Sequence, residues 1–194
     1  MHKSNWDRMR TEAMQPTKTR NDLWMDLGLV AFLVALIVAS RLLPHAPGFL
    51  PVAASGLFAA RVLHIPVLAI IVPVLGMILS DVALPGEDWR IQAVGFAAIA
   101  IPAILGIATR RWNTVLPTIA TVVVSSFLFF LLSNGAVWAF SGMYPLNLAG
   151  LTQCYVLALP FLEKTLLGDL FWTGALFGGF WAIQNGALLA GRAR

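Results

Sequence analysis

The stretch SNGAVWAFSGMYPLNLAGLTQCYVLALPFLEKTLLGD, from Ser133 to Asp169, decides the fold because it lies between two apolar runs of membrane-spanning length. It concentrates the polar and aromatic side chains of an otherwise apolar chain. Polar side chains at membrane depth are costly, so those in this stretch require an explanation. The run from 147 to 189 is too long for one crossing at about 1.5 Å per residue, and Pro160 interrupts it. We therefore expect a short helix over 148–162 at the outer membrane face, followed by a last span over 165–189.

The composition of the whole chain is typical of a polytopic membrane protein. Of its 194 residues, 59% are hydrophobic and only 11% are charged, whereas soluble domains carry about 25% charged residues. Apolar runs over about 22–43, 51–63, 65–84, 89–109 and 115–132 predict five further spans. The run over 51–63 is short and rich in small residues, which predicts close packing against its neighbours or a helix that stops part way. We expect an all-α membrane helix bundle, with a cytoplasmic arm over 1–21 and a single six-helix domain over 22–194.

The distribution of lysine and arginine predicts the orientation of the bundle. If the N-terminus lies inside, only Arg41, Arg90 and Lys164 of the 13 basic residues lie outside. This asymmetry follows the positive-inside rule and requires an even number of spans. We therefore expect six spans with both termini in the cytoplasm. The loops over 41–50, 81–90 and 134–164 then all face outward.

Several classes of function are disfavoured by what the sequence contains. Basic residues sit at the ends of spans and in the N-terminal tail, so the net charge of +4 sets topology and predicts no nucleic-acid partner. The single cysteine, Cys154, has no histidine near it in sequence and is expected to be a packed, inert thiol. No paired Cys/His spacing predicts a metal site, and no cofactor is expected. Hydrolase, P-loop and HExxH motifs are absent, which disfavours an enzyme; the least favoured interpretation is a lipid enzyme using Asp81 and Asp169.

A polar and aromatic set in the predicted outer loops is the candidate binding site. Aromatic rings supply contact area and amides orient a ligand, as in many small-molecule pockets. The alternative is an interfacial belt, since Trp and Tyr gather at the headgroup level in any case. Asp81 has an alternative too, a salt bridge with Arg41 or Arg90. The predicted substrate-binding residues are Asp81, Trp89, Asn134, Trp138, Tyr144, Asn147, Gln153 and Asp169.

An alanine stripe marks one face of the first predicted span. Ala31, Ala35 and Ala39 recur every four residues and share a helix face. Such a stripe lets another helix approach closely. Packing inside the same bundle is one interpretation, and a docking face for a partner subunit is the other.

Four strings of this sequence resemble an uncharacterised family of bacterial integral membrane proteins. They are RLLPHAPGFLPVAASGLF (41–58), LSDVALPG (79–86), LFFLLSNGAVWAFSGMYPLNLAGLTQCYVLALPF (128–161) and KTLLGDLFWTGALFG (164–178). The likeness covers about residues 25–185. That family is itself similar to the S components, the substrate-binding subunits of energy-coupling factor vitamin transporters.

The resemblance implies a six-helix protein of the bacterial inner membrane that binds a vitamin-like molecule from the outer side. It also implies that Ala31, Ala35 and Ala39 dock on the transmembrane subunit of an ATP-driven coupling module. The sequence carries no riboflavin, thiamine or biotin signature. We therefore expect a membrane-embedded substrate-binding transport protein, whose partners are a small-molecule ligand, the lipid bilayer and an energising module. The alternative is an accessory or assembly subunit of a larger membrane complex, whose polar strip contacts another subunit, a pigment or a lipid.

Overall fold

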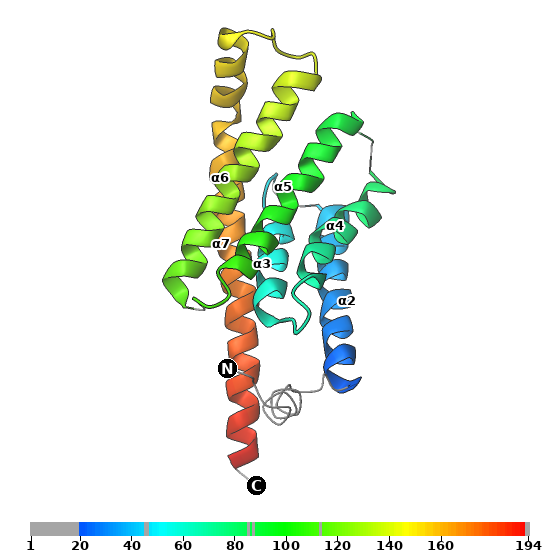
Figure 1. Cartoon of the computed structure of the whole chain (residues 1–194), viewed down its shortest axis with the longest axis vertical. Coiled ribbons are helices and arrows are strands. Elements are labelled where there is room, and N and C mark those ends of the chain that lie inside the picture. Colours follow the sequence, from blue (N-terminus) through cyan, green and yellow to red (C-terminus); the bar gives the residue numbers. More distant parts are fainter. Residues whose placement is uncertain (1–19, 45–46, 85, 87, 113, 193–194) are drawn as a thin grey trace, which may run out of the picture.

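The part of the chain that the structure describes is built from helices alone. The computed structural model describes residues 20–44, 47–84, 86, 88–112 and 114–192, and side chains from residue 21 to residue 185. Within these residues the elements are α2 (Arg20–Leu42), α3 (Val52–Val62), α4 (Leu68–Asp81), α5 (Trp89–Ala108), α6 (Val115–Phe140) and α7 (Leu148–Arg192) (Figure 1). The all-helical prediction is confirmed for this part. The arm predicted over 1–21 falls outside it, apart from the first two residues of α2.

Four of these helices are long and apolar enough to cross a membrane. The candidate spans are Asn21–Leu42 in α2, Trp89–Ala108 in α5, Val115–Phe140 in α6 and Leu148–Asn185 in α7. The helices α3 and α4 have 11 and 14 residues. At 1.5 Å per residue they measure about 17 and about 21 Å, less than the roughly 30 Å of a bilayer core. The structure thus supports a helical membrane bundle in which α3 and α4 reach only part of the way across.

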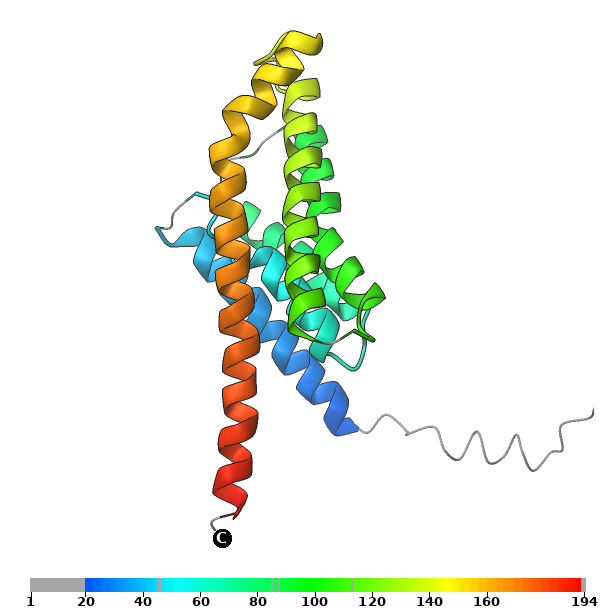
Figure 2. The same cartoon turned by 90° about the vertical axis from the view of Figure 1, so that its left-hand side faces the viewer.

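The prediction of a separate surface helix over 148–162 is wrong. α7 is one continuous helix of 45 residues with Pro160 inside it. Proline removes one hydrogen bond and costs about 3 kcal/mol, whereas ending the helix there would leave several backbone groups without partners. In an apolar environment the second cost is larger, so the helix bends and continues. Figure 2 shows the bend in the yellow and orange first third of α7.

The helices α6 and α7 form an antiparallel hairpin that extends beyond the other helices, as both views show (Figures 1 and 2). α6 continues to Phe140, past the end predicted at 132. Contacts between the two helices include a hydrogen bond from the Tyr155 hydroxyl to the Leu131 carbonyl at 2.7 Å and a distance of 3.5 Å between the Cys154 thiol and the Asn134 carbonyl oxygen. Tyr155 and Cys154, which belong to the stretch from Ser133 to Asp169, therefore help to hold α6 and α7 together.

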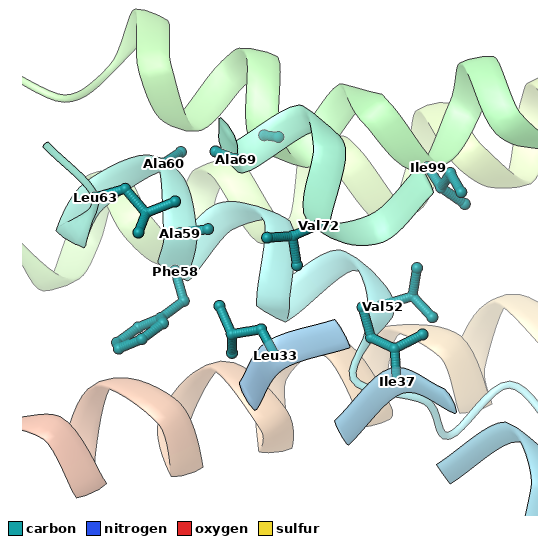
Figure 3. Close-up of a cluster of buried hydrophobic side chains, with 11 residues drawn as sticks. Leu33, Ile37, Val52, Phe58, Ala59, Ala60, Leu63, Ala69, Val72 and Ile99 are labelled. Carbon is teal, nitrogen blue, oxygen red and sulfur yellow. The ribbon is translucent and has the colours of Figure 1, made fainter. Parts of the chain in front are cut away.

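The short helix α3 is the centre of the packing, as its small residues predicted. Nearly all of it is buried, and it contributes Phe58, Ala59 and Ala60 to the core cluster (Figure 3). A Cβ atom added at Gly106 of α5 would lie 2.7 Å from the Ala60 Cβ and 2.9 Å from the Leu57 Cδ1. The absence of a side chain at residue 106 is thus what lets α5 approach α3 so closely.

The alternating helix directions place two polar clusters at opposite ends of the bundle. At one end, called here the Arg41 end, Arg41 of α2 meets Asp81 of α4. At the other end the carboxylate of Asp26 in α2 accepts hydrogen bonds from the backbone N–H groups of His64 and Ile65, at 3.1 and 2.9 Å. The same carboxylate lies 2.9 Å from the His64 Nδ1. Asp26, which the sequence analysis did not single out, thereby holds the turn between α3 and α4.

Candidate functional site

A cavity of about 650 Å³ lies within the Arg41 end of the bundle, and every described helix contributes to its lining. Most of the wall is apolar, with Phe96 and Ile99 from α5 and Phe129 from α6. Polar groups reach it at a few points only. This combination of apolar walls and few polar groups is typical of a small-molecule site. The polar side chains in the lining are those of Arg41, Asp81, Gln92, Ser125, Ser133, Thr165 and Asp169.

One side of the cavity is a charged pair closed by hydrogen bonds. The Arg41 Nη1 donates to the Asp81 Oδ1 at 2.5 Å, and also to the Ser80 hydroxyl. The Gln92 Nε2 donates to the Asp81 Oδ2 at 3.0 Å. Both oxygens of Asp81 therefore have partners. A cation in the last turn of α2 also suits the helix dipole, whereas a carboxylate at the end of α4 does not, which favours the pairing.

Of the two partners considered for Asp81, Arg41 is the one observed. Arg90 instead binds its neighbour Asp88, with 3.1 Å between the Nη2 and Oδ2 atoms. Asp88 caps the start of α5, and its hydrogen bonds with the Arg90 side chain and backbone lower the pKa of the Asp88 carboxyl. Trp89 beside it is 73% exposed and does not line the cavity.

The other side of the cavity holds a buried carboxylate. Asp169 is only 4% exposed, and its Oδ2 accepts a hydrogen bond from the Ser126 hydroxyl at 2.6 Å. A smaller space next to the cavity is lined by Ser125, Asp169 and Thr173. The hydroxyl oxygens of Ser125 and Thr173 are buried and have no hydrogen-bond partner among the described residues. The α7 face that carries Asp169 is thus polar within an apolar core.

The loop between α2 and α3 covers α7 beside this carboxylate. A Cβ atom added at Gly168 would lie 2.9 Å from the Phe49 Cα, so the loop backbone and the helix are in close contact. The Phe49 ring packs on Phe171 and Trp172, with centroids 5.1 and 6.5 Å away. The loop and α7 together form one wall of the site.

Of the eight predicted substrate-binding residues, the structure brings only Asp81 and Asp169 to the cavity. Three others make local hydrogen bonds in the α6–α7 hairpin. The Asn134 Nδ2 donates to the Phe130 carbonyl at 2.8 Å, and the Trp138 Nε1 donates to the Pro145 carbonyl at 3.1 Å. The Asn147 side-chain oxygen accepts from the Gly150 N–H at 2.9 Å, at the start of α7. The remaining three, which also do not line the cavity, are Trp89, Tyr144 and Gln153.

Two helix faces carry cavity residues that the sequence analysis did not single out. On α6, Ser125, Phe129 and Ser133 line the cavity at a spacing of four residues. On α7, Thr165 precedes Asp169 by four residues and Thr173 follows it by four. Residues at this spacing share one helix face. A polar stripe inside an otherwise apolar span was the signal available for both faces.

The described residues contain no group of three or more His, Cys, Asp or Glu side chains that could hold a metal ion. Cys154 is 2% exposed and packs between α6 and α7, as expected of a structural thiol. The cavity is thus lined by hydrogen-bonding and apolar groups.

The alanine stripe of α2 faces away from the bundle. Ala31, Ala35 and Ala39 are all exposed, whereas Leu33 and Ile37 on the other side of the helix are fully buried. A Cβ atom added at Gly76 of α4 would lie 2.7 Å from the Ile37 Cγ2, so α4 packs against that buried side. The stripe therefore does not serve packing among the described helices.

Sequence comparison assigns the chain to a family. It belongs to a family of unknown function, DUF6580, whose sequence profile matches residues 21–189. No curated protein and no solved structure matches the chain.

Proposed function

We propose that this member of the DUF6580 family is a membrane-embedded binding protein that captures a small molecule in the cavity at the Arg41 end. The observation that carries the proposal is the cavity of about 650 Å³. Ligand pockets measure roughly 300–1,000 Å³ and are mostly apolar with a few polar groups. The ligand is accordingly a compact molecule with an apolar body and a polar group.

The direction of capture in this proposal follows from charge. Arg41, Arg90 and Lys164 are the three basic residues, of 13, that fall on the outer side when the N-terminus lies inside. With both termini in the cytoplasm of a bacterial cell, the Arg41 end opens outward. A ligand then enters from the outer face, and six helices complete the bundle although α3 and α4 are short.

A transport role needs an energy source, and the sequence contains no nucleotide-binding motif. The exposed stripe Ala31, Ala35 and Ala39 is the proposed docking face for an ATP-driven coupling module. In this respect the chain acts as an S-component-like subunit that passes a vitamin-like molecule to the module. Exposure of the stripe supports the proposal because a face already packed inside the bundle would have no room for a partner.

The second candidate function is that of an accessory subunit in a larger membrane complex. The tip of the α6–α7 hairpin favours it, since Met143, Leu146 and Leu148 are 67%, 71% and 78% exposed. Exposed apolar side chains on a projecting element are typical of contact sites for lipid or protein. In that case subunits rather than a small molecule co-purify with the chain.

Native mass spectrometry of the full chain with a cavity-filling variant tests the proposal. Gly95 lines the cavity, and a Cβ atom there meets nothing within 4 Å, so Gly95→Phe fills the cavity without a backbone clash. The matched control is Gly174→Phe, at an exposed glycine of α7 with equally open surroundings. We expect the wild type and Gly174→Phe to retain a stoichiometric small molecule that Gly95→Phe has lost. Equal retention in all three, or subunits without any small molecule, would rule the proposal out.

A further inference from the structure

Charge is unevenly distributed around the cavity. Arg41, Asp81 and Asp169 are the charged residues among those that line it. Arg41 and Asp81 neutralise each other in an ion pair. Asp169 has no ion-pair partner among the described residues and is 4% exposed. An occupant that supplies positive charge would stabilise the ionised form of a carboxyl group that is buried in an apolar core without a cation.

The hydrogen-bonding groups around Asp169 are also incompletely used. A carboxylate accepts about four hydrogen bonds, and the described residues supply one, from Ser126. The Ser126 hydroxyl has a single proton and also lies 3.0 Å from the Val122 carbonyl, so even this donor is shared. The buried Ser125 and Thr173 hydroxyls lie beside Asp169 and have no hydrogen-bond partner among the described residues. Hydrogen-bonding capacity of the carboxylate and of the Ser125 hydroxyl is therefore left unused at this side of the cavity.

On this basis we infer that Asp169, with Ser125, binds a cationic nitrogen of the ligand, such as an ammonium group or a protonated nitrogen heterocycle. The inference rests on the proposed function and names its ligand class. The cation supplies N–H donors to the carboxylate and to the Ser125 hydroxyl oxygen, while the apolar part of the ligand packs on Phe96 and Phe129. An anionic ligand does not fit, because Asp81 already occupies Arg41. A bare Mg²⁺ or Ca²⁺ ion does not fit either, since these ions prefer six or more oxygen ligands.

Three probes of one shape test the inference. The full chain in nanodiscs of zwitterionic lipid is titrated calorimetrically with 4-phenylbutylamine, 4-phenylbutan-1-ol and 4-phenylbutyrate, and titrations of empty nanodiscs are subtracted. Hydrogen bonds to a charged group predict that the amine binds about 10- to 100-fold more tightly than the alcohol. The acid should bind most weakly of the three. Absence of an amine preference, or of saturable amine binding, overturns the inference.

Variants distinguish the contribution of Asp169 to the amine preference from that of the rest of the cavity. Asp169→Asn should abolish the amine preference, whereas Glu163→Gln, at an exposed acid of the same helix, should keep it. If Asp169→Asn does not fold, Ser125→Ala should reduce the preference several-fold. A preference that survives these substitutions overturns the inference.

The retained molecule distinguishes this failure from a failure of the proposed function. If the wild type retains a molecule that Gly95→Phe has lost, and that molecule carries no cationic nitrogen, the binding function stands and the role of Asp169 is refuted. If no molecule is retained and no probe binds, both fail.

Discussion

Replacing Asp26 should destabilise the bundle at the end opposite the cavity. Asp26 is 2% exposed and its carboxylate accepts from the backbone N–H groups of His64 and Ile65. In Asp26→Ala both donors lose their partner, at about 1–3 kcal/mol each, which gives about 2–6 kcal/mol. The His64 side chain is 49% exposed, so water reaches this turn and reduces the loss. We expect the lower part of the range, about 2–3 kcal/mol.

The Asp26→Asn variant should lose about half as much stability as Asp26→Ala. Asp26→Asn keeps one carbonyl oxygen but replaces the other acceptor by an NH₂ group, so one of the two backbone donors stays bonded and the loss is about half as large. The assay is unfolding in mixed micelles at increasing mole fraction of SDS, followed by far-UV circular dichroism. The control is Asp88→Asn, which changes one member of the partly exposed Asp88–Arg90 pair and should leave the midpoint of unfolding unchanged. Wild-type stability of Asp26→Ala, or equal losses for Asn and Ala, would refute the reasoning.

Three further predictions concern packing, the cavity and docking. Gly106→Val should destabilise the bundle by about 1–3 kcal/mol in the same assay, because its Cβ would lie 2.7 Å from the Ala60 Cβ; wild-type stability would contradict the packing described. Asp81→Ala should weaken retention of the bound molecule at least about 10-fold, because Arg41 loses its partner. Asn134→Ala should leave retention unchanged. Retention is measured by native mass spectrometry, and a larger loss for Asn134→Ala than for Asp81→Ala would contradict the prediction. Ala35→Trp should abolish co-purification of a coupling partner while leaving small-molecule retention intact, and loss of both would assign the substitution to folding.

The helical architecture could be predicted from the sequence because it depends on local properties. Apolar runs of about 20 residues mark α2, α5 and α6 whatever their neighbours are. The small residues of α3 likewise indicated close packing. The continuity of α7 could not be predicted in this way, because it depends on the balance between one lost hydrogen bond at Pro160 and the cost of ending a helix in an apolar environment.

The candidate site was predictable only in part, because a sequence shows polar groups but not their partners. Asn134 and Trp138 look like ligand-binding groups until their acceptors, the carbonyls of Phe130 and Pro145, are seen a few residues away. Asp169 stood out because apolar residues surround it in the chain, and it does line the cavity. Thr165 and Thr173, four residues before and after Asp169, indicate a polar helix face in the sequence as well. The larger cluster of polar and aromatic residues in the α6–α7 hairpin was the stronger pattern and pointed elsewhere.

α7 is one continuous helix that extends far beyond the cavity. Asp169 lies beside the cavity, and the helix runs on without another proline to Arg192. At 1.5 Å per residue this arm is about 35 Å long, so a tilt of about 5° at the cavity would move its far end by about 3 Å. Any tilt of α7 at Asp169 would therefore be magnified at the opposite end of the molecule.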